Sequence, residues 1–203
     1  DYKSSARDLD LAEVYYGISL QMLAYLDVVI ANAPRWLGQK AIPAGVLYFH
    51  IHNPMIQSEH PLSEEKIEEE RFKKFKMNGL VLHDLEALEL MDNQIAEKHS
   101  DIIPFGLKKD GKPTKYSKAA TREEFDAIRS HVRRMTKTIG TELTRGVVDI
   151  SPYRYKKETP CTFCEFRPLC QFDQSFAEND YRLLKAENAE NILKKMLAER
   201  NGE

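Results

Sequence analysis

Helical and strand patterns alternate along this chain of 203 residues, and this alternation constrains its fold more than any other feature. Between Asp10 and about Ala33, apolar residues recur at three- and four-residue steps, which predicts one core helix that ends just before Pro34. Residues 44–54 then alternate between two faces, as in a strand with one apolar side. Because long helices separate the strands, we expect an α/β domain. The apolar positions of the first helix are Leu11, Val14, Ile18, Met22, Leu26 and Val29.

The clearest local signal lies in the second half of the chain. Thr121 and Glu124 form a capping box, which predicts the start of a helix that keeps its apolar register until Gly146. The pair Asp110–Gly111 predicts a tight turn before this helix. Other patterns predict a charged helix at 63–76, a strand at 79–82, a helix at 85–97, a strand at 146–157 and a polar helix at 179–203.

The composition is that of a folded globular protein, since 42% of the residues are hydrophobic and 31% are charged. No apolar run approaches the roughly 20 residues that cross a bilayer, and residues 1–5 lack the basic and apolar layout of a signal peptide. We therefore expect a cytoplasmic protein. The chain opens without a methionine, inside a predicted strand, so we expect it to be the tail of a longer protein.

The net charge of −2 conceals a strong asymmetry along the chain. Residues 108–157 contain 14 Lys and Arg against 6 Asp and Glu. Such a basic half fits a protein that meets a polyanion, although a solvated helix surface explains the charges equally well. On the predicted helix, the basic side chains lie opposite the apolar face and would line the path of a single DNA strand. They are Arg129, Arg133, Arg134 and Lys137.

All three cysteines fall within ten residues, with the spacing C-x2-C-x5-C at Cys161, Cys164 and Cys170. Cytosolic thiols stay reduced, so the cluster predicts a metal centre rather than disulfides. A zinc site usually adds a second C-x2-C pair or two histidines, which this segment lacks. An iron–sulfur cluster takes four thiolates and accepts one distant ligand, so we favour a cluster whose fourth cysteine lies outside this chain. Zinc with a remote ligand and three ordinary buried thiols remain the alternatives. The neighbours expected to keep the centre dry are Phe163, Phe166, Leu169 and Phe172.

The first three residues, Asp1-Tyr2-Lys3, form the end of a predicted strand, so the Asp1 carboxylate and the Lys3 ammonium project from the same face. A carboxylate is a hard oxygen ligand for Mg²⁺, and a lysine beside the metal would orient the attacking water. This arrangement suits phosphodiester hydrolysis. A surface strand with an ordinary ion pair is the alternative explanation of so short a motif.

A second short motif follows on the first predicted helix. Gln21 and Tyr25 are four residues apart, so their amide and phenol share one helix face. Both groups can form hydrogen bonds to DNA phosphates or bases without adding charge. The same spacing would suit a partly buried polar pair whose members satisfy each other.

Together these motifs resemble a known family. D-x-K on a strand, Q-x3-Y on the next helix and a C-terminal cysteine trio are similar to the RecB-like branch of the PD-(D/E)xK nucleases with an iron–sulfur staple. Within that branch, the chain resembles the AddB subunits of bacterial AddAB helicase–nucleases over essentially its whole length. The stretches that carry the resemblance are DYKSSARDLDLAEVYYGISLQMLAYLD, PAGVLYFHIHNP and CTFCEFRPLCQF.

The resemblance implies a fold and a division of the chain. It implies an α/β nuclease core with a mixed sheet flanked by helices, followed by the iron–sulfur staple. The core would be partial and would occupy residues 1–158. The cysteine-rich segment would occupy 159–176, and a polar C-terminal helix 177–203.

The resemblance also implies roles for single residues. Asp1 would be the second acidic metal ligand and Lys3 the catalytic lysine, with Mg²⁺ as the metal. Gln21 and Tyr25 would be the Q-x3-Y pair of the nuclease core. The three thiolates that would hold a [4Fe–4S] cluster belong to Cys161, Cys164 and Cys170.

By resemblance, we expect a DNA exonuclease domain within an ATP-dependent helicase–nuclease that resects double-strand breaks for recombinational repair. An AddA-like subunit would supply the helicase and a second nuclease, and would feed one DNA strand to this site. The upstream remainder of the same subunit would add the first acidic metal ligand and the fourth cysteine. Two other functions remain open: a non-catalytic DNA-end-binding module and a zinc-stabilised interaction domain.

Overall fold

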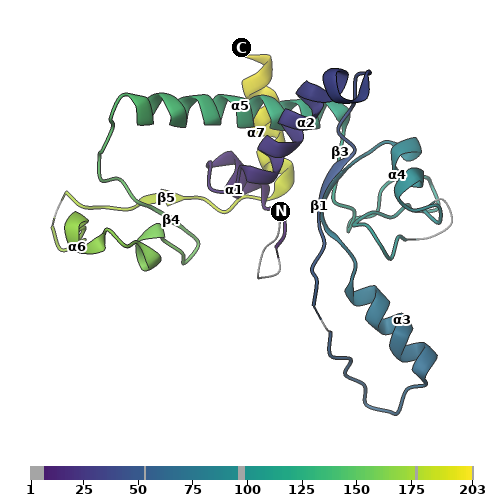
Figure 1. Cartoon of the computed structure of the whole chain (residues 1–203). Helices are drawn as coiled ribbons and strands as arrows, with labels where there is room; N and C mark the ends of the chain where they lie inside the picture. The colour runs from purple at the N-terminus through teal and green to yellow at the C-terminus, as the bar shows by residue number, and fades with distance from the viewer. Residues whose placement is uncertain (1–6, 53, 96–98, 177, 203) are drawn as a thin grey trace. The chain divides into compact units, whose positions relative to one another are not determined.

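The computed structural model describes residues 7–52, 54–95, 99–176 and 178–202 of the chain (Figure 1). These residues form two compact units, each with its own set of contacts. Among the helices that are described, none is both long and apolar enough to cross a lipid bilayer.

The chain enters the second unit early and returns to it late. Residues 1–10 and 21–129 make up the first unit, and residues 11–20 and 130–203 make up the second. The longest helix, α5 (Arg122–Thr144), begins in the first unit and continues into the second.

A mixed three-stranded sheet organises the first unit. The strand order is β1-β2-β3, with β1 antiparallel and β3 parallel to the central β2. Apolar side chains from β2 and the segments after it form a core that includes Val81, Leu88 and Phe105. The elements of this unit before α5 are α2 (Gln21–Leu37), β1 (Gly45–Tyr48), α3 (Glu64–Lys74), β2 (Asn78–Leu82), α4 (Leu85–Met91) and β3 (Ala119–Ala120).

Gly79 allows the backbones of β1 and β2 to approach closely. Its φ of +138° lies in a region that residues with a side chain rarely adopt, and a Cβ atom at this position would lie 2.0 Å from the Val46 carbonyl oxygen. Gly79 pairs with Leu47 in the ladder. No larger residue fits at this position without moving one of the strands.

Helix α3 confirms the predicted charged and exposed helix. The Ser63 hydroxyl caps it by accepting a hydrogen bond from the Lys66 amide, and Glu64 and Glu65 occupy the first turn. None of the helix residues is buried. Figure 1 shows α3 at the far end of a long excursion of the chain between β1 and β2.

Both predicted ends of α5 are confirmed. The Thr121 amide donates to the Glu124 carboxylate over 2.7 Å, and the Glu124 amide donates to the Thr121 hydroxyl over 3.2 Å, which is a reciprocal capping box. At the other end, Gly146 has a φ of +70°, and the amides of Gly146 and Val147 donate back into the last turn.

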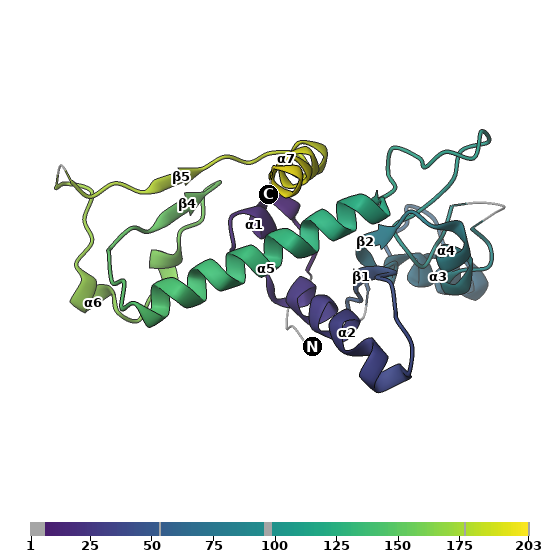
Figure 2. The ribbon, with the colours of Figure 1, turned by 90° about the horizontal axis from the view of Figure 1, so that it is seen from above.

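The second unit combines short helices with a two-stranded parallel sheet. Strand β4 pairs with β5, and α1 packs against α7, as Figure 2 shows. Buried apolar residues of α1 and α7 include Val14, Ile192 and Met196. Besides the end of α5, the elements of this unit are α1 (Leu11–Tyr15), β4 (Tyr153–Tyr155), the 3-10 turn η1 (Pro160–Phe163), α6 (Arg167–Cys170), β5 (Arg182–Leu184) and α7 (Ala189–Asn201).

The prediction of one helix from Asp10 to Ala33 is wrong, because the chain breaks after Tyr15. Gly17 adopts a φ of +78°, and the amides of Gly17 and Ile18 donate to the carbonyls of Val14 and Glu13. These two hydrogen bonds form a Schellman motif that ends α1. The stripe expected to be buried is buried only in part, and Val29 on α2 is 46% exposed.

Several predicted boundaries are also wrong. Pro34 lies inside α2 and not beyond it, because a proline removes one hydrogen bond but keeps a helical φ. The strand predicted over 44–54 ends at Tyr48. The predicted elements at 85–97, 146–157 and 179–203 shorten to α4, β4 and α7.

Candidate functional site

Gln21 and Tyr25 lie on the first turns of α2 and contact each other directly. The Gln21 side-chain amide donates to the Tyr25 hydroxyl over 2.8 Å. Tyr25 is 50% exposed, so the pair is open to solvent rather than partly buried. Because the Tyr25 oxygen accepts this bond, its own proton is available for another acceptor.

Asp1 and Lys3 lie outside the described residues. The next acidic residue along the chain is Asp8, whose carboxylate forms an ion pair with the Lys118 ammonium. Lys118 immediately precedes β3. The segment that follows the D-x-K motif is therefore tied to the sheet of the first unit.

The three cysteines line one pocket of about 190 Å³ in the second unit. Cys161 lies in η1, Cys164 directly follows this turn, and Cys170 ends α6. All three are free thiols. Within the described ranges, no group of three or more His, Cys, Asp or Glu side chains is close enough to hold a metal ion as it stands. The three thiols thus line one cavity, but as they stand they do not form a set of metal ligands.

The expected dry shell around the cysteines is largely absent from the described part of the chain. Phe163, Phe166 and Leu169 are 92%, 70% and 83% exposed. Only Phe172 behaves as expected: it lines the pocket and packs edge-on against Tyr181, with ring centroids 4.9 Å apart. The reason is that η1 and α6 are each a single turn, too short to bury both of their faces.

The four basic residues on α5 have different surroundings. Arg129 Nε donates to Asp27 Oδ1 over 2.8 Å, and both side chains are only 14% exposed. Arg134 forms an ion pair with Glu199. Arg133 and Lys137 are exposed. At least two of the four cationic groups are therefore engaged by carboxylates within the chain.

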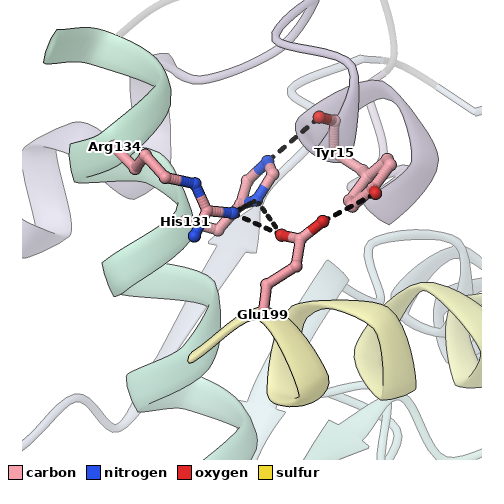
Figure 3. Close-up of polar contacts among 4 residues, drawn as sticks. All are labelled: Tyr15, His131, Arg134 and Glu199. Carbon is pink, nitrogen blue, oxygen red and sulfur yellow. Dashed lines mark hydrogen bonds and ion pairs between the residues drawn. The ribbon is translucent and has the colours of Figure 1, made fainter. Parts of the chain in front are cut away.

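Four side chains of the second unit converge where α7 meets α1 and α5 (Figure 3). The Tyr15 hydroxyl donates to Glu199 over 2.8 Å, and the His131 ring stacks on Tyr15 with centroids 5.0 Å apart. Arg134 Nη2 contacts both the Glu199 carboxylate and His131 Nδ1. His131 is 4% exposed, so this polar cluster is part of the packing of α7.

The protonation states in this cluster follow from its geometry. His131 Nε2 lies 3.0 Å from the Tyr15 carbonyl, which can only accept, so Nε2 carries a proton. Burial acts to raise the pKa of Glu199, but the hydrogen bond from Tyr15, the contact with His131 and the charge of Arg134 outweigh it and lower that pKa. The same hydrogen bond to Glu199, together with burial, raises the pKa of Tyr15 to about 12. Glu199 is therefore held ionised and Tyr15 neutral over the usual pH range.

Comparison with known proteins places the chain in a family. It matches the family model of the PD-(D/E)XK nuclease superfamily over residues 1–171. The chain belongs to this superfamily. The nuclease fold predicted from the resemblance is thus confirmed, and the mixed sheet and flanking helices of the first unit are part of it.

Relatives of this PD-(D/E)XK chain are named as subunits of an ATP-dependent helicase/deoxyribonuclease. The proteins from Bacillus subtilis (strain 168) and Bacillus licheniformis are 54% and 53% identical over 202 and 199 residues, which are 100% and 98% of this chain. The protein from Oceanobacillus iheyensis is 49% identical over 203 residues, again the whole chain. The chain spans 17% of the length of each of these relatives.

The cluster around Glu199 leads to a prediction about this PD-(D/E)XK chain. Glu199→Gln should remove a carboxylate that accepts from Tyr15 and Arg134, and should destabilise α7 by about 1 to 2 kcal/mol at pH 7. Since the folded pKa of Glu199 is lowered, its contribution is present above the unfolded pKa and is lost as the pH falls through the folded pKa. The difference between variant and parent should therefore shrink in acid. Hydrogen exchange of the α7 amides in the intact protein measures this.

The matched control is Glu190→Gln on the same helix. Glu190 is exposed and pairs only with Lys194 in the described structure, an i,i+4 contact on the surface. Exchange of α7 should hardly change in this variant. Equal exchange in both variants at pH 7 would show that the Glu199 cluster does not hold α7.

Proposed function

We propose that this chain is the DNA exonuclease domain of an ATP-dependent helicase–nuclease that resects double-strand breaks. The observation that carries the proposal is the superfamily match, because it spans residues 1–171 and so includes both the D-x-K and the Q-x3-Y motifs. The names of the relatives, which combine helicase with deoxyribonuclease and call the protein a subunit, support a role inside a larger complex.

Each motif residue has a distinct task in this proposal. Asp1 offers a hard oxygen ligand to Mg²⁺, which when bound would polarise the phosphate and lower the pKa of a water molecule. Lys3 orients that water or neutralises the charge that develops on the phosphate. The Tyr25 hydroxyl donates a hydrogen bond to a phosphate oxygen, while the 2.8 Å hydrogen bond from Gln21 holds the phenol in place.

In this proposal, other parts of the complex complete the nuclease site and supply the helicase. Since the chain spans 17% of its relatives, the upstream part of the protein would supply the first acidic metal ligand. An AddA-like partner subunit would supply the helicase and a second nuclease. Of the four basic residues proposed to contact DNA, Arg133 and Lys137 are the more exposed, whereas carboxylates engage Arg129 and Arg134.

We also propose that Cys161, Cys164 and Cys170 hold a [4Fe–4S] cluster together with one upstream cysteine. The presence of three free thiols in the lining of one pocket supports it, since thiolates are the ligands that such clusters take. Phe172 and Tyr181 line the same pocket and would shield one side of the cluster.

A metal titration of the intact helicase–nuclease tests the proposed nuclease site. Each strand of a duplex is labelled separately, and cutting is followed as Mg²⁺ is added back after chelation. Asp1→Asn should raise the Mg²⁺ concentration for half-maximal cutting of one strand by about tenfold or more, because it removes an ionised ligand. Cutting of the other strand, by the partner's nuclease, should stay as in the parent.

Asp8→Asn is the matched control, since it neutralises a nearby carboxylate that pairs with Lys118. It should leave the Mg²⁺ requirement of both strands unchanged. If Asp1→Asn behaves in the same way, Asp1 is not a metal ligand and the proposed site is wrong.

A further inference from the structure

A lysine-rich loop lies between α4 and β3 in the first unit, over residues 106–118. Five of its residues are lysines, and Asp110 is its one acidic residue. The sequence predicted only the tight turn at Asp110–Gly111, and the structure confirms it, with Gly111 at a φ of +74° and its amide donating to the Lys108 carbonyl.

The loop is held in one shape by its own hydrogen bonds. The Ser117 hydroxyl donates to the Gly106 carbonyl over 2.8 Å and accepts from the Gly106 amide over 3.1 Å. The Thr114 amide also donates to the Gly106 carbonyl, and the Lys108 amide donates to the Lys112 carbonyl. Such closure fixes the backbone before any ligand arrives, so binding costs less conformational entropy.

The charged groups of the loop point to an anionic ligand. Lys108, Lys109, Lys112 and Lys115 are all exposed, and none forms an ion pair within the part of the chain that the structure describes. The Asp110 carboxylate accepts from the Lys112 backbone amide and is the one acidic group of the loop, so most of the ammonium charge is not compensated within the loop. Four like charges on a rigid loop repel one another, and a polyanion relieves that repulsion.

An aromatic ring lies among these lysines. Tyr116 is 75% exposed, and the Lys115 ammonium lies 4.7 Å from the centre of its ring. The ring makes no contact with another aromatic side chain among the described residues. An exposed ring between cations is the pattern with which proteins bind single-stranded nucleic acid, because bases stack on the ring and cations bind the phosphates.

The base of the loop is tied to the segment that follows the D-x-K motif. Lys118 forms the ion pair with Asp8, and Asp8 comes five residues after Lys3. Five residues reach at most about 18 Å. The loop base is therefore linked to a residue that lies close to the proposed catalytic lysine along the chain.

We propose that residues 106–118 form a binding site for a single DNA strand next to the nuclease site. The ammonium groups of Lys109, Lys112 and their neighbours bind successive phosphates, and Tyr116 stacks on one base. This inference rests on the proposed nuclease function and adds the strand-holding element to it. An acidic surface of a partner protein is the competing ligand.

Binding of a fluorescent single-stranded oligonucleotide to the intact complex, measured over a range of salt, tests the site. The double variant K109Q/K112Q should weaken binding by about tenfold and lower the slope of log affinity against log salt by about 1.4, since each phosphate contact on single strands contributes about 0.7. K73Q/K194Q is the matched control, because it removes the same charge from two exposed helix lysines. It should leave the slope unchanged.

A local readout avoids interference from other DNA contacts of the complex. An oligonucleotide carrying 5-iodouracil should form a photo-crosslink to Tyr116, and Tyr116→Phe should keep the binding strength that Tyr116→Ala loses. A slope equal to that of the control, or crosslinks of the loop lysines to a partner protein and not to DNA, would overturn the proposal. A salt slope lowered as expected in K109Q/K112Q, together with cutting at the parental rate by Lys3→Ala, would refute the nuclease function and leave the loop site standing.

Discussion

Lys3→Ala in the intact helicase–nuclease is expected to reduce Mg²⁺-dependent cutting of one DNA strand by about a hundred- to a thousandfold. The size follows from the loss of a cation that stabilises the charge developing on the phosphate, which acts only in the transition state. The Mg²⁺ concentration for half-maximal cutting and the affinity for DNA should stay close to those of the parent. Single-turnover cleavage with each strand labelled separately measures all three quantities.

Two further variants sharpen this result. Lys40→Ala removes an exposed lysine from the loop after α2 and should cut at the parental rate. Lys3→Arg keeps the charge but cannot place it at the same point, so it should fall between the parent and Lys3→Ala. If Lys3→Ala cuts both strands at the parental rate, the chain is a DNA-end-binding module without its own chemistry.

Under the proposed cluster assignment, Cys164→Ala should release the iron and loosen the whole segment between β4 and β5. A cluster held by four thiolates loses its folding energy when one ligand is removed, and the one-turn elements around Cys164 have little other packing. In protein purified without air, the parent should contain iron and absorb broadly in the visible range. The variant should lose both properties, and protease should cut it within residues 153–184.

Thr162→Ala is the control for this experiment. Thr162 lines the same pocket as the three thiols but carries no thiolate, so its loss should leave the iron and the digest unchanged. Stoichiometric zinc in the parent would assign the centre to zinc. Iron retained in Cys164→Ala, with an unaltered digest, would show that Cys164 is not a ligand.

Capping signals in the sequence predict both ends of α5. The capping box at Thr121 and the stop at Gly146 were both predicted, and the structure has both. Gly17 carries the same sequence signal as Gly146, a glycine after a helical pattern, and both glycines adopt a positive φ in the structure. The apolar stripe, however, continues past Gly17. Because the apolar periodicity continues through the end of α1, it predicts one helix where the structure has two.

In the candidate site too, contacts between residues close in sequence were predictable, whereas burial by residues distant in sequence was not. The contact of Gln21 with Tyr25 follows from helix geometry alone, and so did the prediction that the amide and phenol share one face. The spacing of the cysteines predicted one shared metal centre, and the three thiols line one pocket, but the predicted burial of Phe163 and Leu169 is wrong. Burial depends on residues that are distant along the chain, and no local pattern reports them.

The cluster around Glu199 was not predictable from the sequence. Tyr15 and His131 are 116 residues apart, and His131 and Glu199 are 68 apart. On its own helix, each residue looks like an ordinary polar or aromatic position. Only the packing of α1, α5 and α7 brings them together.

Gly79 determines the alignment of the two longest strands of the sheet as well as their separation. The backbone oxygen of Val46 occupies the space that a Cβ of residue 79 would need, so only a residue without a side chain can stand at that rung. A shift of β2 by one residue would bring Asn78 or Leu80 to the same point and create a clash. The absence of a side chain at residue 79 thereby favours the observed register of β1 and β2 over a shifted one. This register in turn determines which residues begin and end the paired segment.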